Sequence, residues 1–172
     1  MEREAITLPK LTIDQLVELG ADHDSMVTPT SSIYEIDPLA TQLGTRIKEK
    51  LSDGTIQDRK RLLRVLPRIA NEVIQNAIEH GNELDPSKQI HAYFLWQEHG
   101  SGNALMYIAV QDEGKGFDVN RYRLKNPKHG GEALPWAREM FDHIYNFGDP
   151  AVYMAQVIRR DGAKPIVVEK GS

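Results

Sequence analysis

The stretch that decides the fold is Glu72-Val-Ile-Gln-Asn76-Ala-Ile-Glu-His80-Gly81. Its polar residues Glu72, Asn76 and His80 are spaced four apart, which predicts that they share one face of a helix, since side chains at that spacing lie one turn above another. An apolar stripe runs beside them, formed by Leu66, Ile69, Ala70, Val73, Ile74, Ala77 and Ile78. We therefore expect a helix that buries one side and presents a carboxylate, an amide and an imidazole as a functional site.

Composition narrows the class of protein. The chain has 172 residues, enough for one well-cored domain and short for two. Its net charge is -4 and its basic residues form no single stripe, which argues against a nucleic-acid partner. Without cysteine there are no disulfides or thiolate metal sites. No secretion signal and no apolar run of the roughly 20 residues that cross a bilayer is visible, so we expect a cytoplasmic protein with no membrane partner.

The chain divides into three parts by pattern. Residues 1–30 form an N-terminal extension with one short helical pattern ending at Gly20, and this extension is either a flexible arm or a docking or dimer element. The domain proper is expected over residues 31–160. Residues 161–172 are expected to be a C-terminal strand or tail.

The first half of the domain is expected to be mainly helical. A strand is predicted at 32–36 and a helix at 38–51, before a turn signal. A second helical region runs over 55–81 and contains Pro67. Because proline lacks an amide donor and clashes with the preceding turn, a break or kink is expected near residues 64–66.

The second half is expected to supply the sheet. Two strands, 89–98 and 104–111, are joined by a glycine-containing segment that suits a hairpin. Both faces of the second strand are apolar enough to be partly covered. The later patterns predict a helix at 134–141 and strands at 143–147, 151–159 and 165–168. The order favours an α+β, two-layer α/β sandwich, with helices packed on one face of a mixed, mostly antiparallel sheet.

A second motif, Asp112-Glu-Gly114-Lys-Gly116-Phe117, follows the strand at 104–111. Strand parity puts Asp112 on the face of Ile108 and Val110. If that face packs against helices, the carboxylate is partly desolvated and needs a hydrogen-bond donor. An adenine amine is one such donor; an ordinary turn, in which Asp112 caps backbone amides, is the alternative.

A third motif, His129-Gly130-Gly131-Glu-Ala133-Leu134-Pro135, puts glycines directly before a predicted helix. Such a junction offers free backbone amides and the positive end of a helix dipole, which suit phosphate binding. An ordinary loop before a proline-started helix is the alternative. The preceding basic segment either closes over phosphates or stays solvated; it contains Arg121, Arg123, Lys125, Lys128 and His129.

In chain order these motifs resemble the N, G1 and G2 boxes of the GHKL (Bergerat-fold) ATPases, most closely the bacterial anti-sigma-factor serine kinases. The resemblance implies a Bergerat-type ATP-binding fold with ATP and Mg²⁺ as cofactors. It implies that Glu72 is the catalytic base, that Asn76 is the metal ligand, and that His80 supports the pocket or lies at its edge. The nucleotide-binding residues that it implies are Asn76, His80, Asp112, Gly114, Gly116, Phe117, Gly130, Gly131, Ala133 and Leu134.

The resemblance also implies a function in transcription control. The chain would phosphorylate a serine of an anti-sigma-factor antagonist of the STAS type, bind a sigma factor, and form a homodimer. Two departures favour an alternative, a catalytically weak or inactive nucleotide-binding regulatory module. Ala133 stands where the family has a second glycine, and the segment 148–151 lacks an expected threonine.

Other classes of protein fit the sequence less well. The catalytic domain of a histidine kinase would need a phosphoacceptor histidine on a helical hairpin, but no histidine lies between His23 and His80. The chain has neither a Gly-x-x-x-x-Gly-Lys-Ser/Thr loop nor a His-Glu-x-x-His helix. A plain α/β scaffold with chance motifs is the remaining alternative.

Overall fold

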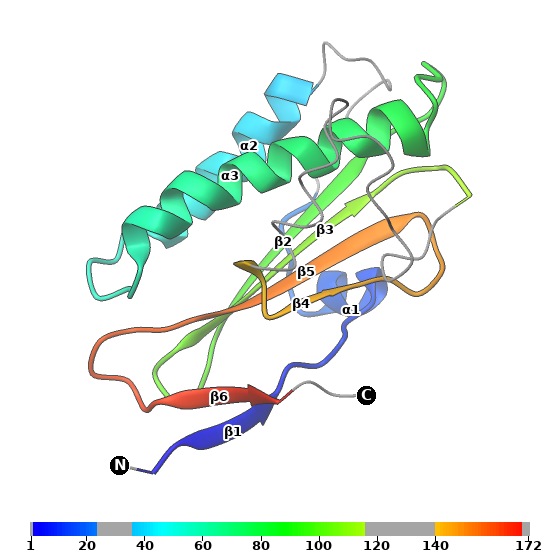
Figure 1. Cartoon of the computed structure of the whole chain (residues 1–172). Helices are drawn as coiled ribbons and strands as arrows, with labels where there is room; N and C mark the ends of the chain where they lie inside the picture. Colours follow the sequence, from blue (N-terminus) through cyan, green and yellow to red (C-terminus); the bar gives the residue numbers. More distant parts are fainter. Residues whose placement is uncertain (1, 24–35, 116–139, 170–172) are drawn as a thin grey trace.

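The computed structural model describes residues 2–23, 36–115 and 140–169. Within these residues the chain is α+β, with a four-stranded antiparallel sheet and a separate parallel pair of strands. Two long helices lie side by side over one face of the sheet (Figure 1). A short helix lies at the other face, and the parallel pair joins the two ends of the chain (Figure 1).

The elements follow one another from helices to sheet. The helices are α1 (Ile13–Glu18), α2 (Ile36–Lys50), α3 (Arg59–Asn76) and the π-helical turn η2 (Ala77–Gly81). The strands are β1 (Glu4–Thr7), β2 (His91–Glu98), β3 (Ala104–Gln111), β4 (His143–Tyr145), β5 (Ala151–Ile158) and β6 (Ile166–Glu169). The large sheet has the order β2-β3-β5-β4, and β1 pairs with β6.

The register of the central strand β3 defines two ends of the sheet. At one end Gln111 lies opposite His91 of β2 and Ala151 of β5. At the other end Ala104 lies opposite Glu98 and Ile158. We call these the Gln111 end and the Ala104 end. The predicted β2–β3 hairpin is confirmed by this register.

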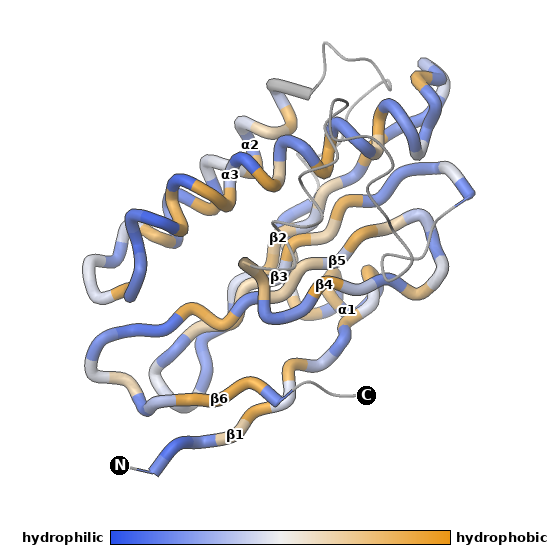
Figure 2. Tube along the Cα trace, viewed as in Figure 1, coloured by the Kyte–Doolittle hydropathy of each residue, from blue (hydrophilic) through white to orange (hydrophobic). Residues whose placement is uncertain are grey.

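Each face of the sheet has its own apolar core, because successive strand residues point to opposite faces. Met106 and Ile108 are at most 1% exposed and pack with α2 and α3. Tyr107 and Ala109 are equally buried in a second cluster that includes Leu16 of α1. Figure 2 shows hydrophobic residues along the central strands and hydrophilic ones at the connecting turns. The prediction that both faces are covered is confirmed.

The N-terminal segment takes part in this second core. The hydroxyl of Tyr107 donates to the carbonyl of Pro9 at 3.0 Å, and that of Tyr145 donates to the carbonyl of Leu11 at 2.9 Å. Asp22 forms an isolated bridge with Phe94 of β2. The described part of the expected extension is therefore packed against the sheet, and α1 lies on the face opposite α2 and α3, so helices cover both faces rather than one.

Of the break or kink predicted near residues 64–66, the break is wrong, because α3 is one continuous helix that contains Pro67. The flanking residues Leu66 and Ile69 are fully buried in the helix–sheet core. The proline ring faces α2, where a Cβ built on Gly44 would lie 3.9 Å from the Pro67 Cβ. Burial on both sides thus outweighs the cost of an internal proline, about 3 kcal/mol.

Most predicted boundaries hold within a few residues, and some lie outside the described residues. The second helical region starts at Arg59 rather than residue 55. The strand predicted at 32–36 lies outside the described residues except for Ile36, which begins α2. Most of the helix predicted at 134–141 also lies outside them.

Candidate functional site

The C-terminal half of α3 carries two of the predicted site residues. Glu72 and Asn76 are both half-buried and lie one helical turn apart. The Glu72 side chain is 21% exposed, and its Oε1 lies 3.7 Å from Nε of Arg68. The structure thus keeps the carboxylate and the amide on neighbouring turns of one helix, as the four-residue spacing predicts.

His80 does not continue this row. It lies in η2, a π-helical turn in which hydrogen bonds join residues five apart, so a spacing of four no longer stacks it above Asn76. Its side chain is 71% exposed, and its Nε2 lies 4.0 Å from Oε2 of Glu79. The prediction that Glu72, Asn76 and His80 share one face of a regular helix is therefore wrong at His80. π-Helical turns are nevertheless frequent at functional sites.

The end of η2 lies directly against the end of β3. A Cβ placed on Gly81 would lie 2.0 Å from Oδ2 and 2.3 Å from Cγ of Asp112. A Cβ placed on Gly114 would lie 2.2 Å from the carbonyl oxygen of Gly81. Neither position has space for a side chain. Glycine at both positions lets the helix end and the loop after β3 enclose the Asp112 carboxylate.

Asp112 occupies the helix-facing side of the sheet, as strand parity predicts, and is 8% exposed. Its amide donates to the carbonyl of Pro150 at 2.8 Å, and its Oδ1 accepts from the amide of Gly114 at 2.7 Å. Burial raises the pKa of the Asp112 carboxyl, while the Gly114 hydrogen bond and the charge of Lys88 oppose this rise. Oδ2 accepts no hydrogen bond from the described residues and packs against Gly81.

Asn82 holds the two motifs together and was not singled out from the sequence. It is fully buried. Its Oδ1 accepts from the amide of Glu113 at 2.6 Å, and its Nδ2 donates to the carbonyl of Gln89 at 3.0 Å. The amide of Gln89 in turn donates to the Glu113 carboxylate. The only sequence signal would have been a polar residue directly after Gly81, which alone marks an ordinary helix end.

Part of the predicted site lies outside the described residues. This part comprises Gly116, Phe117, Gly130, Gly131, Ala133, Leu134 and the basic segment between the last two motifs. Lys115, the last described residue before it, is exposed. In the described ranges no three His, Asp or Glu side chains are grouped to hold a metal ion. In the same ranges no helix has the length and apolar character to cross a membrane.

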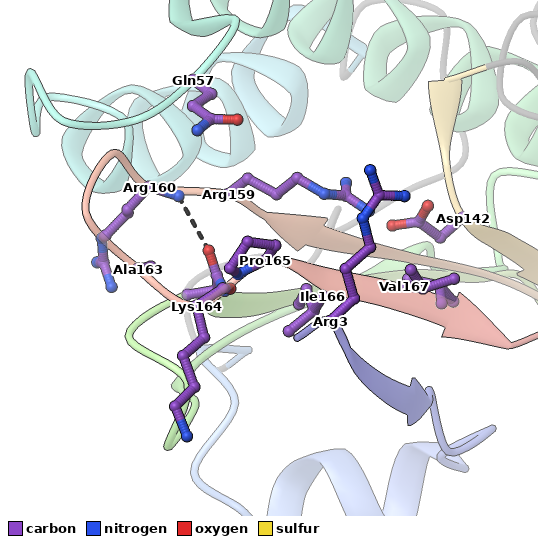
Figure 3. A pocket seen from close by; sticks show the side chains of 12 residues that line it. Arg3, Gln57, Asp142, Arg159, Arg160, Ala163, Lys164, Pro165, Ile166 and Val167 are labelled. Atoms are coloured by element: carbon purple, nitrogen blue, oxygen red, sulfur yellow. Dashed lines mark hydrogen bonds between the residues drawn. The ribbon is translucent and has the colours of Figure 1, made fainter. Parts of the chain in front are cut away.

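A cavity of about 550 Å³ lies elsewhere, at the Ala104 end of the sheet. It is lined by residues around the β5–β6 connection and by Arg3, which precedes β1 (Figure 3). None of the residues singled out from the three motifs lines it. The cavity and the Asp112 cluster are therefore separate candidate sites.

Comparison with protein-family models gives no match for this chain, and comparison with curated proteins finds no significantly similar sequence.

Proposed function

We propose that the chain has a Bergerat-type fold that binds ATP with Mg²⁺, and that it is a protein-serine kinase acting on an anti-sigma-factor antagonist of the STAS type. In this proposal it also binds a sigma factor and works as a cytoplasmic homodimer, so that phosphorylation controls which partner is held. The observation that carries the proposal is the contact of Gly81, Asp112 and Gly114. It joins the first two motifs around one buried carboxylate.

This contact suits the recognition of an adenine ring. Oδ1 of Asp112 is held by the Gly114 amide, which leaves Oδ2 for the exocyclic amine. A hydrogen bond to such a charged group is worth about 1.5–3 kcal/mol net. Gly81 and Gly114 bring the main chain close to the Asp112 carboxylate. An adenine ring bound to this carboxylate would need to approach the main chain equally closely. Asn82 fixes the loop in place through Glu113.

Glu72 and Asn76 fit the reacting end of the substrate. Asn76 is half-buried, and its side chain makes no capping hydrogen bond at the start of η2, which leaves the side-chain oxygen for a metal ion. Mg²⁺ prefers oxygen ligands and keeps several waters, so one protein ligand suffices. The bound ion would neutralise charge on the phosphate oxygens. Glu72 would accept the serine hydroxyl proton, with Arg68 orienting its carboxylate at 3.7 Å.

A nucleotide-binding regulatory module with little or no turnover is the second candidate. Ala133 stands in the phosphate-binding motif where glycine is expected, and if that position needs a left-handed backbone, alanine costs roughly 1–2 kcal/mol. This would weaken the hold on the phosphates about tenfold or more. The helix residues Glu72 and Asn76 are retained in either case.

Calorimetric titration with ATP and ADP, each with and without Mg²⁺, tests the proposal. We expect binding of both nucleotides, tighter ATP binding with Mg²⁺, and loss of binding in Asp112→Asn, because an amide in place of the carboxylate weakens the acceptor. Asp161→Asn, at an exposed turn, is the matched control. No heat and no thermal shift with any nucleotide would reject the proposed function. Transfer of labelled phosphate to an antagonist then separates the kinase from the binding module.

A further inference from the structure

The cavity at the Ala104 end brings together two arginines from opposite ends of the chain. Arg3 immediately precedes β1, and Arg159 immediately follows β5. In Figure 3 both guanidinium groups extend toward the same part of the cavity, where the carboxylate of Asp142 also lies. The pairing of β1 with β6, and the hydrogen bond from the Glu4 amide to the carbonyl of Pro165 at 3.0 Å, hold Arg3 beside the β5–β6 connection.

A third arginine in the cavity wall differs from these two, because its guanidinium is paired with carboxylates. Nε of Arg160 lies 3.1 Å from Oδ2 of Asp53, and its Nη2 lies 3.0 Å from Oε1 of Glu98. Its guanidinium points away from the other two in Figure 3. Arg3 and Arg159 form no ion pair or side-chain hydrogen bond with the described residues. The carboxylate of Asp142 lies near both guanidinium groups in Figure 3 and forms no ion pair with either, so two positive charges face one negative charge, and an anion between the arginines is attracted by the net positive charge.

The surrounding walls are fixed by buried hydrogen bonds. Asn103 is 2% exposed; its Oδ1 accepts from the Arg160 amide at 3.0 Å, and its Nδ2 donates to the carbonyl of Lys164 at 2.8 Å. On the opposite wall Oδ2 of Asp142 accepts from the amide of Val157 at 2.8 Å. These hydrogen bonds fix the main chain of the cavity walls next to Arg159, and Asp142 adds an acceptor to the lining.

We propose that this cavity binds a small organic phosphate, with the phosphate group between Arg3 and Arg159. A planar guanidinium donates two parallel hydrogen bonds to phosphate oxygens, and two such groups match its charge at neutral pH. The volume of about 550 Å³ falls in the range of small-molecule sites and exceeds what an inorganic ion fills. Asp142 then accepts a hydrogen bond from a hydroxyl of the organic part, which selects a phosphorylated polyol or sugar.

This site is independent of the proposed nucleotide site. Asp112 follows the last residue of β3, whereas Arg159 follows the β5 residue that pairs with the first residue of β3. Eight strand residues separate the two ends, roughly 25 Å at about 3.3–3.4 Å per residue. A ligand of this size cannot touch both.

Calorimetry with ribose 5-phosphate, ribose and citrate tests the inference. We expect binding of ribose 5-phosphate that weakens as salt is raised, and none of ribose. Arg159→Gln and Arg3→Gln are each expected to weaken it about tenfold or more, since each removes a charge-assisted pair of hydrogen bonds. Arg159→Lys should lose part of the affinity, because it keeps the charge and removes the planar fork.

The controls separate this site from the nucleotide site and from general charge effects. Arg64→Gln, at an exposed position on α3, and Asp112→Asn should leave ribose 5-phosphate binding unchanged. Thermal unfolding checks that each variant folds; Arg3 is exposed, so its variant keeps the test available if Arg159→Gln unfolds. Wild-type affinity for ribose 5-phosphate in both arginine variants, or no binding of ribose 5-phosphate by the wild type, would overturn the proposal. Binding of citrate alone would overturn the phosphate class.

Discussion

Gly81 and Asp112 are in direct contact: a Cβ on residue 81 would lie 2.0 Å from the Asp112 Oδ2. This contact joins the end of a helix to the end of the central strand. Only glycine fits at position 81, because any Cβ there would collide with the Asp112 carboxylate. The backbone itself does not require glycine, since Gly81 is not among the residues with positive φ.

Gly81→Ala is therefore expected to lower the free energy of unfolding by roughly 1–3 kcal/mol, the usual cost of forcing atoms into a filled space. Gly54→Ala is the matched control, since a Cβ there meets nothing within 4 Å, and it should change stability by less than about 0.5 kcal/mol. Denaturant unfolding measures both. Equal free energies of unfolding for the two variants would contradict this prediction, because they would show that the Asp112 side chain moves aside without loss of stability.

Asp112→Asn is expected to change the pH dependence of stability. Burial raises the pKa of the folded-state carboxyl above its ordinary value of 3.8, so between the two values the folded state binds more protons than the unfolded state. Raising the pH through this window therefore destabilises the wild type. The asparagine variant lacks this effect, so its stability relative to wild type should rise from about pH 3.8 upward. If the free energies of unfolding of the wild type and of Asp112→Asn changed in parallel with pH, the raised pKa of Asp112 would be contradicted.

Asn82→Ala is expected to cost about 2–4 kcal/mol, because it leaves the amide of Glu113 and the carbonyl of Gln89 without their buried partner. Gln75→Ala removes a side-chain hydrogen bond to Glu79 on the half-buried side of α3 and should cost less than about 0.5 kcal/mol. Chemical denaturation compares them. Hydrogen exchange of the Glu113 amide should also rise in the first variant only.

The sequence predicted those features that depend on local periodicity. The helix carrying Glu72, the hairpin strands and the inward side of Asp112 all follow from spacings of four and two residues. Features that depend on contacts between distant segments were missed. The continuity of α3 through Pro67 depends on burial against the sheet, and the role of Asn82 depends on a loop far along the chain. The π turn that displaces His80 has no pattern of its own in the sequence.

The pairing of β1 with β6 was missed for the same reason. Glu4–Thr7 is too short to show alternation, and its partner is Ile166–Glu169 at the other end of the chain. The segment after β1 is fixed by the hydroxyls of Tyr107 and Tyr145, which donate to main-chain carbonyls. An expected appendage thus forms part of the second core.

Leu16→Ala tests whether this N-terminal layer stabilises the domain. Leu16 is 1% exposed in the second core, so its truncation should cost about 2–4 kcal/mol. Leu19, just beyond the same helix, is 46% exposed, and Leu19→Ala should cost less than about 1 kcal/mol. Thermal and denaturant unfolding measure the difference. If Leu16→Ala were as mild as its control, residues 4–18 would be a detachable arm.

Glu72→Gln tests the proposed chemistry on the helix. Loss of a general base lowers kcat by about 10²–10⁴, while the affinity for ATP should change by less than about threefold, because Glu72 is proposed to contact the reacting hydroxyl and not the adenine. Glu79→Gln is the matched control, since Glu79 accepts a hydrogen bond from Gln75 and is assigned no part in the reaction. Single-turnover transfer of labelled phosphate and calorimetry supply the two readouts. Unchanged transfer by Glu72→Gln would reject Glu72 as the base, and ATP binding without transfer by the wild type would favour the regulatory module.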